Sequence, residues 1–145
     1  MIDPYKGRLD IVNYNPLIII DYAHNGVSIK SVLETMRAYN PKRIVSLFGC
    51  GGNRSRDRRY EMGEIAGRYS DYCIITEDNN RYEDVEDIMN DIEIGLSKTK
   101  GQYIKIGNRT EAIKYALDNA MDGDIILLLG KGHETYQEKM GVRIH

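Results

Sequence analysis

Hydrophobic residues in this chain follow two patterns, short continuous runs and longer stretches with apolar positions three or four residues apart. Continuous runs are typical of strands buried on both faces of a sheet, whereas the wider spacing is typical of amphipathic helices. Strands are therefore expected at 17–20, 43–48, 71–76 and 125–129, with weaker signals at 7–12 and 102–106.

Helical spacing follows most of these strands. The first helix is expected to begin at Ser28, as its N-cap, and to stop before Pro41. Asn108, with Glu111 three residues on, resembles a capping box for a later helix. Further helices are expected around 62–69, 85–96 and up to 120, and a short strand is expected at 136–145.

Strand and helix patterns alternate at least four times, which predicts an α/β domain with a mostly parallel sheet and helices on both faces. Ligands of such sheets bind beyond the carboxyl ends of the strands. Four of the expected strand ends carry charged or glycine-rich segments, at 21–26, 49–59, 77–81 and 130–134. We therefore expect these four segments to meet in one site.

Charge and composition narrow the classes of partner. With 20 basic and 22 acidic residues the net charge is −2, so no overall field favours nucleic acid or a membrane surface. No apolar run is long enough for a membrane span, and the N-terminus lacks a signal-peptide pattern. Cys50 and Cys73 form neither a disulfide framework nor a zinc motif, and a reducing, cytoplasmic setting is expected.

Basic charge is concentrated just after the strand at 43–48. Three glycines at 49, 51 and 52 are followed by arginines at 54, 56, 58 and 59. A glycine turn and a helix N-terminus both favour an anion. Arginines at a helix start oppose the helix dipole, so we expect Arg58 and Arg59 to cost stability unless a negative group binds there. The alternative is a solvated loop, and neither nucleotide motif, G-x-G-x-x-G or G-x-x-x-x-G-K-[ST], is present.

Each of the other loops has a functional and a structural interpretation. Asp21 could hold a ribose hydroxyl or form a local turn, and His24 could contact a phosphate or a backbone carbonyl. In the segment Asp78–Arg81 the guanidinium could grip a carboxylate, or Asp78 or Asn80 could cap the next helix. The segment 130–134 could bind a ligand or form a turn between strands.

In combination, these segments resemble the C-terminal domain of the Mur ligases. The matching residues are Asp21-Tyr22-Ala23-His24, Phe48 to Arg54, Asp78-Asn79-Asn80-Arg81 and Gly130 to Gln137, with Gly7 to Asp10 at the domain entry. By this resemblance, residues 1–145 are a single Rossmann-like domain of a longer ligase, whose UDP-binding and central ATPase domains are absent. A stand-alone Rossmann-like nucleotide-binding module and a sensor of cell-wall precursors remain as alternatives.

The resemblance implies an ATP-dependent ligase that adds the third amino acid to UDP-N-acetylmuramoyl-L-alanyl-D-glutamate in peptidoglycan synthesis, and thereby serves cell shape and division. The implied amino acid is meso-diaminopimelate, with lysine as the alternative. ATP and Mg²⁺ would bind mainly to the central domain. The implied partners are the UDP-muramoyl dipeptide, the amino acid, ATP and the other two domains. This chain alone, which lacks a P-loop, is expected to turn over nothing.

The resemblance also implies roles for individual residues. ATP would contact Arg8, Asp21 and His24, with Asp21 at the ribose. The amino acid would contact Arg59, Asp78, Asn79, Arg81, Gly130 and Glu134, with Glu134 on the distal ammonium group. No residue is assigned to catalysis or to a metal. Asn80 stands where the family pattern has proline, so a looser loop is expected there.

Overall fold

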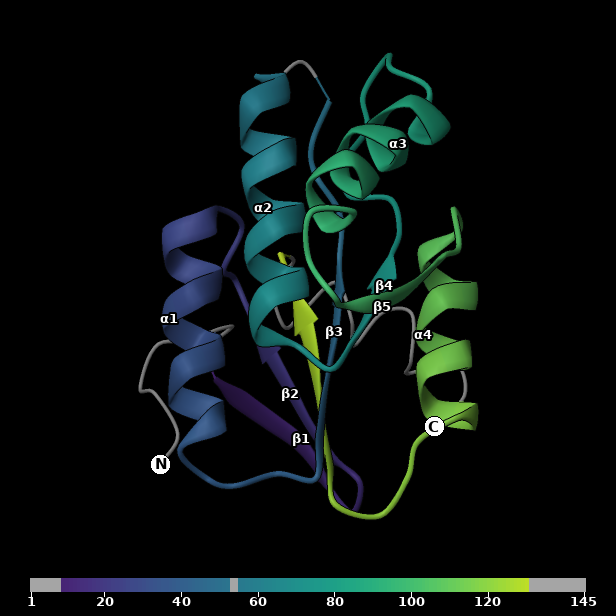
Figure 1. The fold of residues 1–145 in the computed structure, drawn as a ribbon. Coiled ribbons are helices and arrows are strands. Elements are labelled where there is room, and N and C mark those ends of the chain that lie inside the picture. Colours follow the sequence, from purple (N-terminus) through teal and green to yellow (C-terminus); the bar gives the residue numbers. More distant parts are fainter. Residues whose placement is uncertain (1–8, 53–54, 131–145) are drawn as a thin grey trace.

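The computed structural model describes residues 9–52 and 55–130, which form one sheet covered by helices (Figure 1). The strands are β1 (Asp10–Tyr14), β2 (Leu17–Asp21), β3 (Arg43–Phe48), β4 (Tyr72–Ile75), β5 (Gln102–Lys105) and β6 (Asp124–Leu129). The helices are α1 (Gly26–Arg37), α2 (Arg56–Tyr69), α3 (Val85–Leu96) and α4 (Arg109–Asp118). None of these helices combines the length and apolar character needed to cross a bilayer.

The sheet has the order β1-β2-β6-β3-β4-β5. Only β1 is antiparallel to its neighbour, and the other four pairings are parallel. Helices α1, α2 and α3 pack on one face and α4 on the other (Figure 1). The predicted α/β architecture, with a mostly parallel sheet and helices on both faces, is confirmed.

The strand β6 forms the centre of both hydrophobic cores. Its six residues are all buried, which explains the continuous apolar run in the sequence. Ile125 and Leu127 face the core beneath α1, α2 and α3, whereas Ile126 and Leu128 face α4. Because β6 pairs in parallel with both β2 and β3, the carboxyl ends of these three strands lie side by side.

Helix caps agree with the sequence prediction in one case and differ in two. Asn108 caps α4, because its side chain accepts a hydrogen bond from the Glu111 amide, as predicted. The predicted cap Ser28 is wrong: Asn25 caps α1 by accepting from the Ser28 amide. Helix α3 is capped by Asp84, not by Asp78 or Asn80. The strand expected at 136–145 lies outside the described residues.

Helices α2 and α3 approach closely through two glycines. A Cβ placed on Gly63 of α2 would lie 2.0 Å from the Ile92 carbonyl oxygen, and one on Gly95 of α3 would lie 1.9 Å from that of Tyr60. Both distances are far below van der Waals contact. The two helices therefore meet backbone to backbone, which fixes α3 and the loop before it against the start of α2.

We predict that Gly95→Ala destabilises the chain, although alanine is about 1 kcal/mol better than glycine inside a helix. The added methyl group must push α3 away from α2, and such overpacking costs about 1–3 kcal/mol or more. Urea unfolding should show that the free energy of unfolding falls by about 2 kcal/mol.

The control for this prediction is Gly107→Ala, because a Cβ there meets nothing closer than 3.7 Å. Its unfolding free energy should stay unchanged or rise by up to about 1 kcal/mol. Equal stability of the native chain and Gly95→Ala would contradict the close approach of the helices.

Candidate functional site

The segments after β2, β3, β4 and β6 meet in one cleft at the carboxyl ends of these strands. The cleft has a volume of about 150 Å³. It is lined by His24, Gly49, Cys50, Gly51, Arg58, Met62, Asp78, Asn79, Arg81 and Gly130. The expectation that these four segments converge is confirmed for their described residues.

Two arginines give the cleft its positive charge. Arg58 comes from the first turn of α2, and Arg81 comes from the loop between β4 and α3. Both are exposed, and within 9–52 and 55–130 neither forms an ion pair with an acidic residue. Asp78 adds a carboxylate to the same cleft. The cleft can therefore accept a group that carries both charges.

His24 lies at the exposed rim of the cleft, with its ring held in one orientation. Its Nδ1 atom is 2.9 Å from the carbonyl oxygen of Tyr22. Since a carbonyl oxygen only accepts hydrogen bonds, Nδ1 carries the hydrogen, an assignment made from this contact. Nε2 then accepts a hydrogen bond when the ring is neutral and donates one when it is protonated.

The loop that carries Asn79 and Arg81 has an unusual backbone. Both residues have positive φ angles, 51° and 54°, in the left-handed region that side chains disfavour. The amide of Gly52 donates to the Asn79 carbonyl at 3.0 Å, and Asn80 Nδ2 donates to the Glu83 carbonyl at 2.8 Å. Asn80 thus ties the loop by hydrogen bonding, which the expectation of a looser loop did not include.

The glycines after β3 have a packing function. A Cβ on Gly49 would lie 2.2 Å from the Thr76 carbonyl oxygen, and one on Gly52 would lie 2.0 Å from the Asn80 carbonyl oxygen. Only glycine therefore lets the segment after β3 lie directly on the segment after β4. The amide of Gly52 is used by this contact, whereas Gly49 and Gly51 line the cleft.

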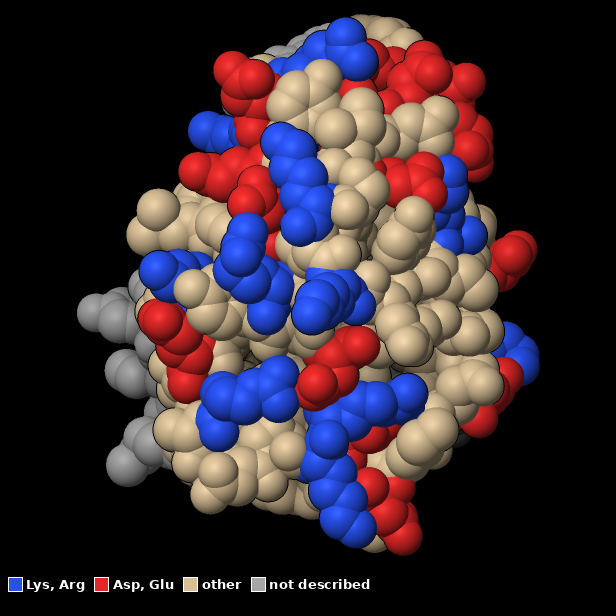
Figure 2. Space-filling view, in the orientation of Figure 1, with Lys and Arg blue, Asp and Glu red and all other residues tan. Residues whose placement is uncertain are grey.

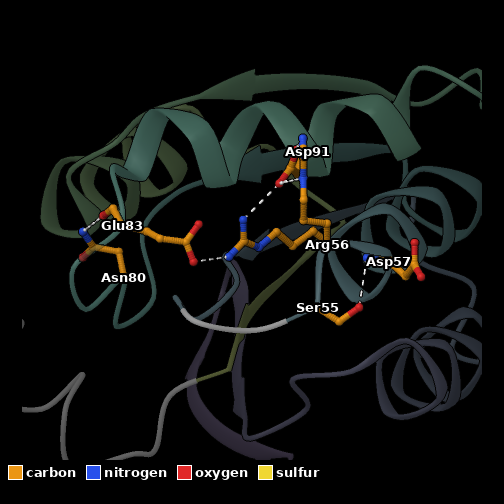
Figure 3. A network of polar contacts seen from close by, with 7 residues as sticks. Ser55, Arg56, Asp57, Asn80, Glu83 and Asp91 are labelled. Atoms are coloured by element: carbon orange, nitrogen blue, oxygen red, sulfur yellow. Dashed lines mark hydrogen bonds and ion pairs between the residues drawn. The ribbon is translucent and has the colours of Figure 1, made fainter.

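Two of the arginines that follow the glycines bind Asp91 of α3 and do not line the cleft. Figure 3 shows Arg56 beside Asp91. Arg59, with 2% of its side chain exposed, donates to Glu83 Oε1 at 2.6 Å and to Asp91 Oδ2 at 2.9 Å. Arg56 donates to both oxygens of Asp91. The expectation that Arg59 needs a bound anion is wrong, because α3 and the loop before it supply the negative charge. Further acidic side chains are concentrated over the N-terminal end of α3 (Figure 2).

These contacts shift the ionisation of the paired groups. The hydrogen bond that Arg59 donates to Glu83 raises the pKa of Arg59, against the opposing effect of burial. Burial would raise the pKa of Asp91, but hydrogen bonds from Arg56 and Arg59 outweigh it and hold the pKa below its usual value. Asp91 is therefore a charged, nearly buried link between two helices.

Cys50 lines the cleft but is unsuited to nucleophilic chemistry. Its thiol is buried, with Sγ 3.2 Å from Sδ of Met62. Burial raises the pKa of Cys50 to about 12, so the thiol stays protonated at neutral pH. Cys50 packs the loop after β3 against α2.

Asp21 is the last residue of β2, and its hydrogen bonds hold neighbouring segments at this end of the strand. Its two carboxylate oxygens accept from the amides of Leu9, at 2.9 Å, and Ala23, at 2.7 Å. Its own carbonyl accepts from the Gly130 amide at 3.0 Å. Asp21 is nearly buried and links the ends of β1, β2 and β6. It thereby fixes the segment that carries His24.

Comparison with known proteins now identifies the family. The family model described as "Mur ligase, glutamate ligase domain" matches residues 7–132. The chain belongs to this family. A UDP-N-acetylmuramoyl-L-alanyl-D-glutamate--2,6-diaminopimelate ligase of Caldanaerobacter subterraneus subsp. tengcongensis is 46% identical over 134 residues, which cover 91% of this chain and 28% of the relative. A similar ligase of Clostridium acetobutylicum is 47% identical over 139 residues, covering 94% and 29%. This Mur ligase domain thus spans under a third of these relatives.

Solved structures agree with this family assignment. A UDP-N-acetylmuramoyl-L-alanyl-D-glutamate--2,6-diaminopimelate ligase superposes with a TM-score of 0.84 at 29% identity, covering 99% of this chain and 33% of that one. UDP-N-acetylmuramate-alanine ligase from Thermotoga maritima shares the fold, with a TM-score of 0.71 at 20% identity, covering 96% and 30%.

The Mur ligase domain places the expected site residues in three groups. The cleft brings together His24, Asp78, Asn79, Arg81 and Gly130. Asp21 lies at the strand end beside them, while Arg59 faces α3 and does not line the cleft. The assigned residues Arg8 and Glu134 lie outside the described residues.

Sequence reasoning did not assign Arg58 to the cleft. Adjacent residues of a helix point about 100° apart, because one turn takes 3.6 residues. Arg58 and Arg59 therefore face different surroundings, and because both are arginines the residue type does not tell which one faces the cleft. The register of α2 against α3 decides it.

We predict that Asp91→Asn destabilises this Mur ligase domain, because the buried guanidinium of Arg59 then keeps only one of its two charged partners, Glu83. Breaking a buried ion pair from one side costs about 3–5 kcal/mol, so a loss of about 3 kcal/mol is expected in urea at pH 7. The control Glu64→Gln removes an exposed pair with Arg68 and should cost less than about 0.5 kcal/mol.

We also predict that the stabilisation contributed by Asp91 depends on pH. The pKa of Asp91 is lower in the folded chain than in the unfolded chain, so its stabilisation is complete above the unfolded value of about 4. It is lost as the pH falls through the folded value. The stability difference between the native chain and Asp91→Asn should therefore narrow below about pH 4. A difference that stays constant down to pH 3 would contradict the charged state of Asp91.

Proposed function

We propose that residues 1–145 are the C-terminal domain of a longer ATP-dependent ligase that joins meso-diaminopimelate to UDP-N-acetylmuramoyl-L-alanyl-D-glutamate. The names of the relatives support the reaction, and the short span of the match supports a domain that works with others. The UDP-binding and ATPase functions would belong to those other domains. The proposed setting is the cytoplasm, in the synthesis of the cell wall that maintains shape and allows division.

The observation that carries this proposal is that two arginines, Arg58 and Arg81, line one small cleft together with Asp78. Meso-diaminopimelate has two amino-acid head groups, and only one amine reacts. The distal head group carries a carboxylate and an ammonium group, which guanidinium and carboxylate side chains can bind respectively. Asn79 adds an amide beside them, and Gly130 adds a surface without a side chain. Glu134 is proposed as a second partner of the ammonium group.

The same charges would disfavour lysine. The distal end of lysine has an ammonium group and no carboxylate, so it would leave Arg58 and Arg81 facing a positive charge. Leaving two charged donors without acceptors in the bound state costs affinity. Discrimination would thus come from this cleft.

The nucleotide is proposed to approach from the side of β2. His24, when protonated, would donate from Nε2 to a phosphate, and Arg8 would add a second cation. For Asp21, whose carboxylate accepts from the amides of Leu9 and Ala23, a ribose contact is proposed at the carboxyl end of β2. ATP, with Mg²⁺, would activate the D-glutamyl carboxylate at the central domain, while this chain holds the attacking amino acid in place. Arg59 is proposed to contact the amino acid by exchanging its bond to Glu83 for one to the substrate.

We predict that Arg81→Met in the full-length ligase raises the KM for meso-diaminopimelate by about 10- to 100-fold, the effect of losing a charged hydrogen bond. The KM for ATP should stay within about twofold, because Arg81 lies on the amino-acid side. Steady-state phosphate release measures both constants.

Arg68→Met is the matched control, since Arg68 lies in the last turn of α2 and pairs with Glu64 far from the cleft. Its kinetic constants should equal those of the native ligase. Native activity with lysine that equals activity with meso-diaminopimelate would contradict the proposed substrate.

We also predict that the 145-residue chain alone does not hydrolyse ATP, because it has no P-loop to hold the phosphates. Phosphate release should stay at the background rate with ATP, Mg²⁺ and meso-diaminopimelate present. Turnover by the purified chain above that of a sample heated to inactivate it would show that the domain assignment is wrong.

A further inference from the structure

Arg109 is a buried cation at the first position of α4. None of its surface is exposed, whereas the other buried residues of α4 are Ala112, Ile113 and Ala116. A positive charge at a helix N-terminus opposes the helix dipole, and a buried guanidinium is costly unless acceptors surround it. Packing of α4 on the sheet would be served by an apolar residue. The charge therefore needs another explanation.

The guanidinium of Arg109 joins the ends of two strands that are not neighbours. Nη1 donates to the carbonyl oxygen of Glu77 at 2.9 Å, and Nη2 donates to that of Leu129 at 2.6 Å. The strand β3 lies between β4 and β6, so these two strands share no backbone hydrogen bonds of the sheet. The amide of Arg109 also donates to Glu77 Oε2 at 3.0 Å. The Arg109 side chain thus connects the carboxyl ends of β4 and β6 on the face of the sheet that α4 covers.

The two residues that Arg109 holds come directly before two residues of the cleft. Glu77 precedes Asp78, and Leu129 precedes Gly130. These cleft residues touch, since a Cβ on Gly130 would lie 2.6 Å from Asp78 Oδ2. Burial lowers the pKa of Arg109 to about 10, while the charges of Asp78 and Glu77 act against this shift. Arg109 therefore stays charged at neutral pH, close enough to feel the charge of Asp78, which lines the cleft.

We propose that Arg109 is a positioning residue. By holding the carbonyls of Glu77 and Leu129, it fixes the spacing between Asp78 and Gly130, and this spacing determines the affinity for the amino-acid substrate. The identity of that substrate rests on the proposed function. The planar fork of arginine bridges two carbonyls at a fixed separation, which the single ammonium group of lysine cannot do. Both Arg109→Lys and Arg109→Met should therefore loosen the two loops.

The first test uses amide hydrogen exchange in the 145-residue chain. The amides of Gly52 and Gly130 bond to Asn79 and Asp21, so they report on the two loops. In Arg109→Met they should exchange about 10-fold faster, while amides within β3 and α2 keep their native rates. Should Arg109→Met fail to fold, Arg109→Lys is measured with the same expectation. Unchanged rates, or an equal increase throughout the chain, would overturn the proposal.

The second test uses the full-length ligase. Arg109→Met should raise the KM for meso-diaminopimelate about 10-fold, with kcat and the KM for ATP within about twofold, because the loss acts on one binding site. Arg43→Met is the control, since Arg43 pairs with Asp124 at the opposite, amino-terminal edge of the sheet. It should lower the unfolding midpoint without changing either KM.

The two tests separate this proposal from the proposed function. A native ligase that does not use meso-diaminopimelate, together with faster exchange confined to Gly52 and Gly130, would refute the function and support the role of Arg109. A native ligase that uses it, with an Arg109→Met variant unchanged in KM and in exchange, would refute the role of Arg109 alone.

Discussion

The cleft depends on the insertion of β6 between β2 and β3. This strand is the last in the described chain and yet pairs in parallel on both sides, with all six residues buried. The free energy of burying these side chains fixes where the strand ends. As a result Gly130 lies against Asp78 across the end of β3, and one wall of the site is set by the packing of the core.

The arginines around the cleft differ in what compensates their charge. Arg59 and Arg109 are buried, and their charges are met by carboxylates or carbonyl oxygens of the protein itself. Arg58 and Arg81 are exposed, and no acidic residue in the described part of the chain forms an ion pair with either. Water can solvate an exposed cation until a ligand replaces it, whereas a buried cation must find its acceptors during folding. This difference separates cations that build the site from cations that can bind.

The glycines of the site work mainly by permitting close contact. At Gly49 and Gly52 the backbone of one loop lies on the carbonyls of the next, and Gly63 and Gly95 bring two helices equally close. These contacts lie in one region of the fold, because α2 follows the glycine loop and α3 follows the Asp78–Arg81 loop. The left-handed conformations of Asn79 and Arg81 persist because the surrounding contacts hold them.

The sequence by itself determined the alternation of strands and helices, the strand boundaries near the cleft and the convergence of four loops, because these follow from local periodicity and the parallel geometry of such sheets. The resemblance to Mur ligases predicted a nucleotide contact at His24 and amino-acid contacts at Asp78, Asn79, Arg81 and Gly130, and these roles stay predictions. Only the tertiary structure decided that Arg58 and not Arg59 faces the cleft, that Asn25 and not Ser28 caps α1, and that Arg109 links β4 to β6. These outcomes depend on helix register and on contacts between residues far apart in the chain, which no local pattern encodes.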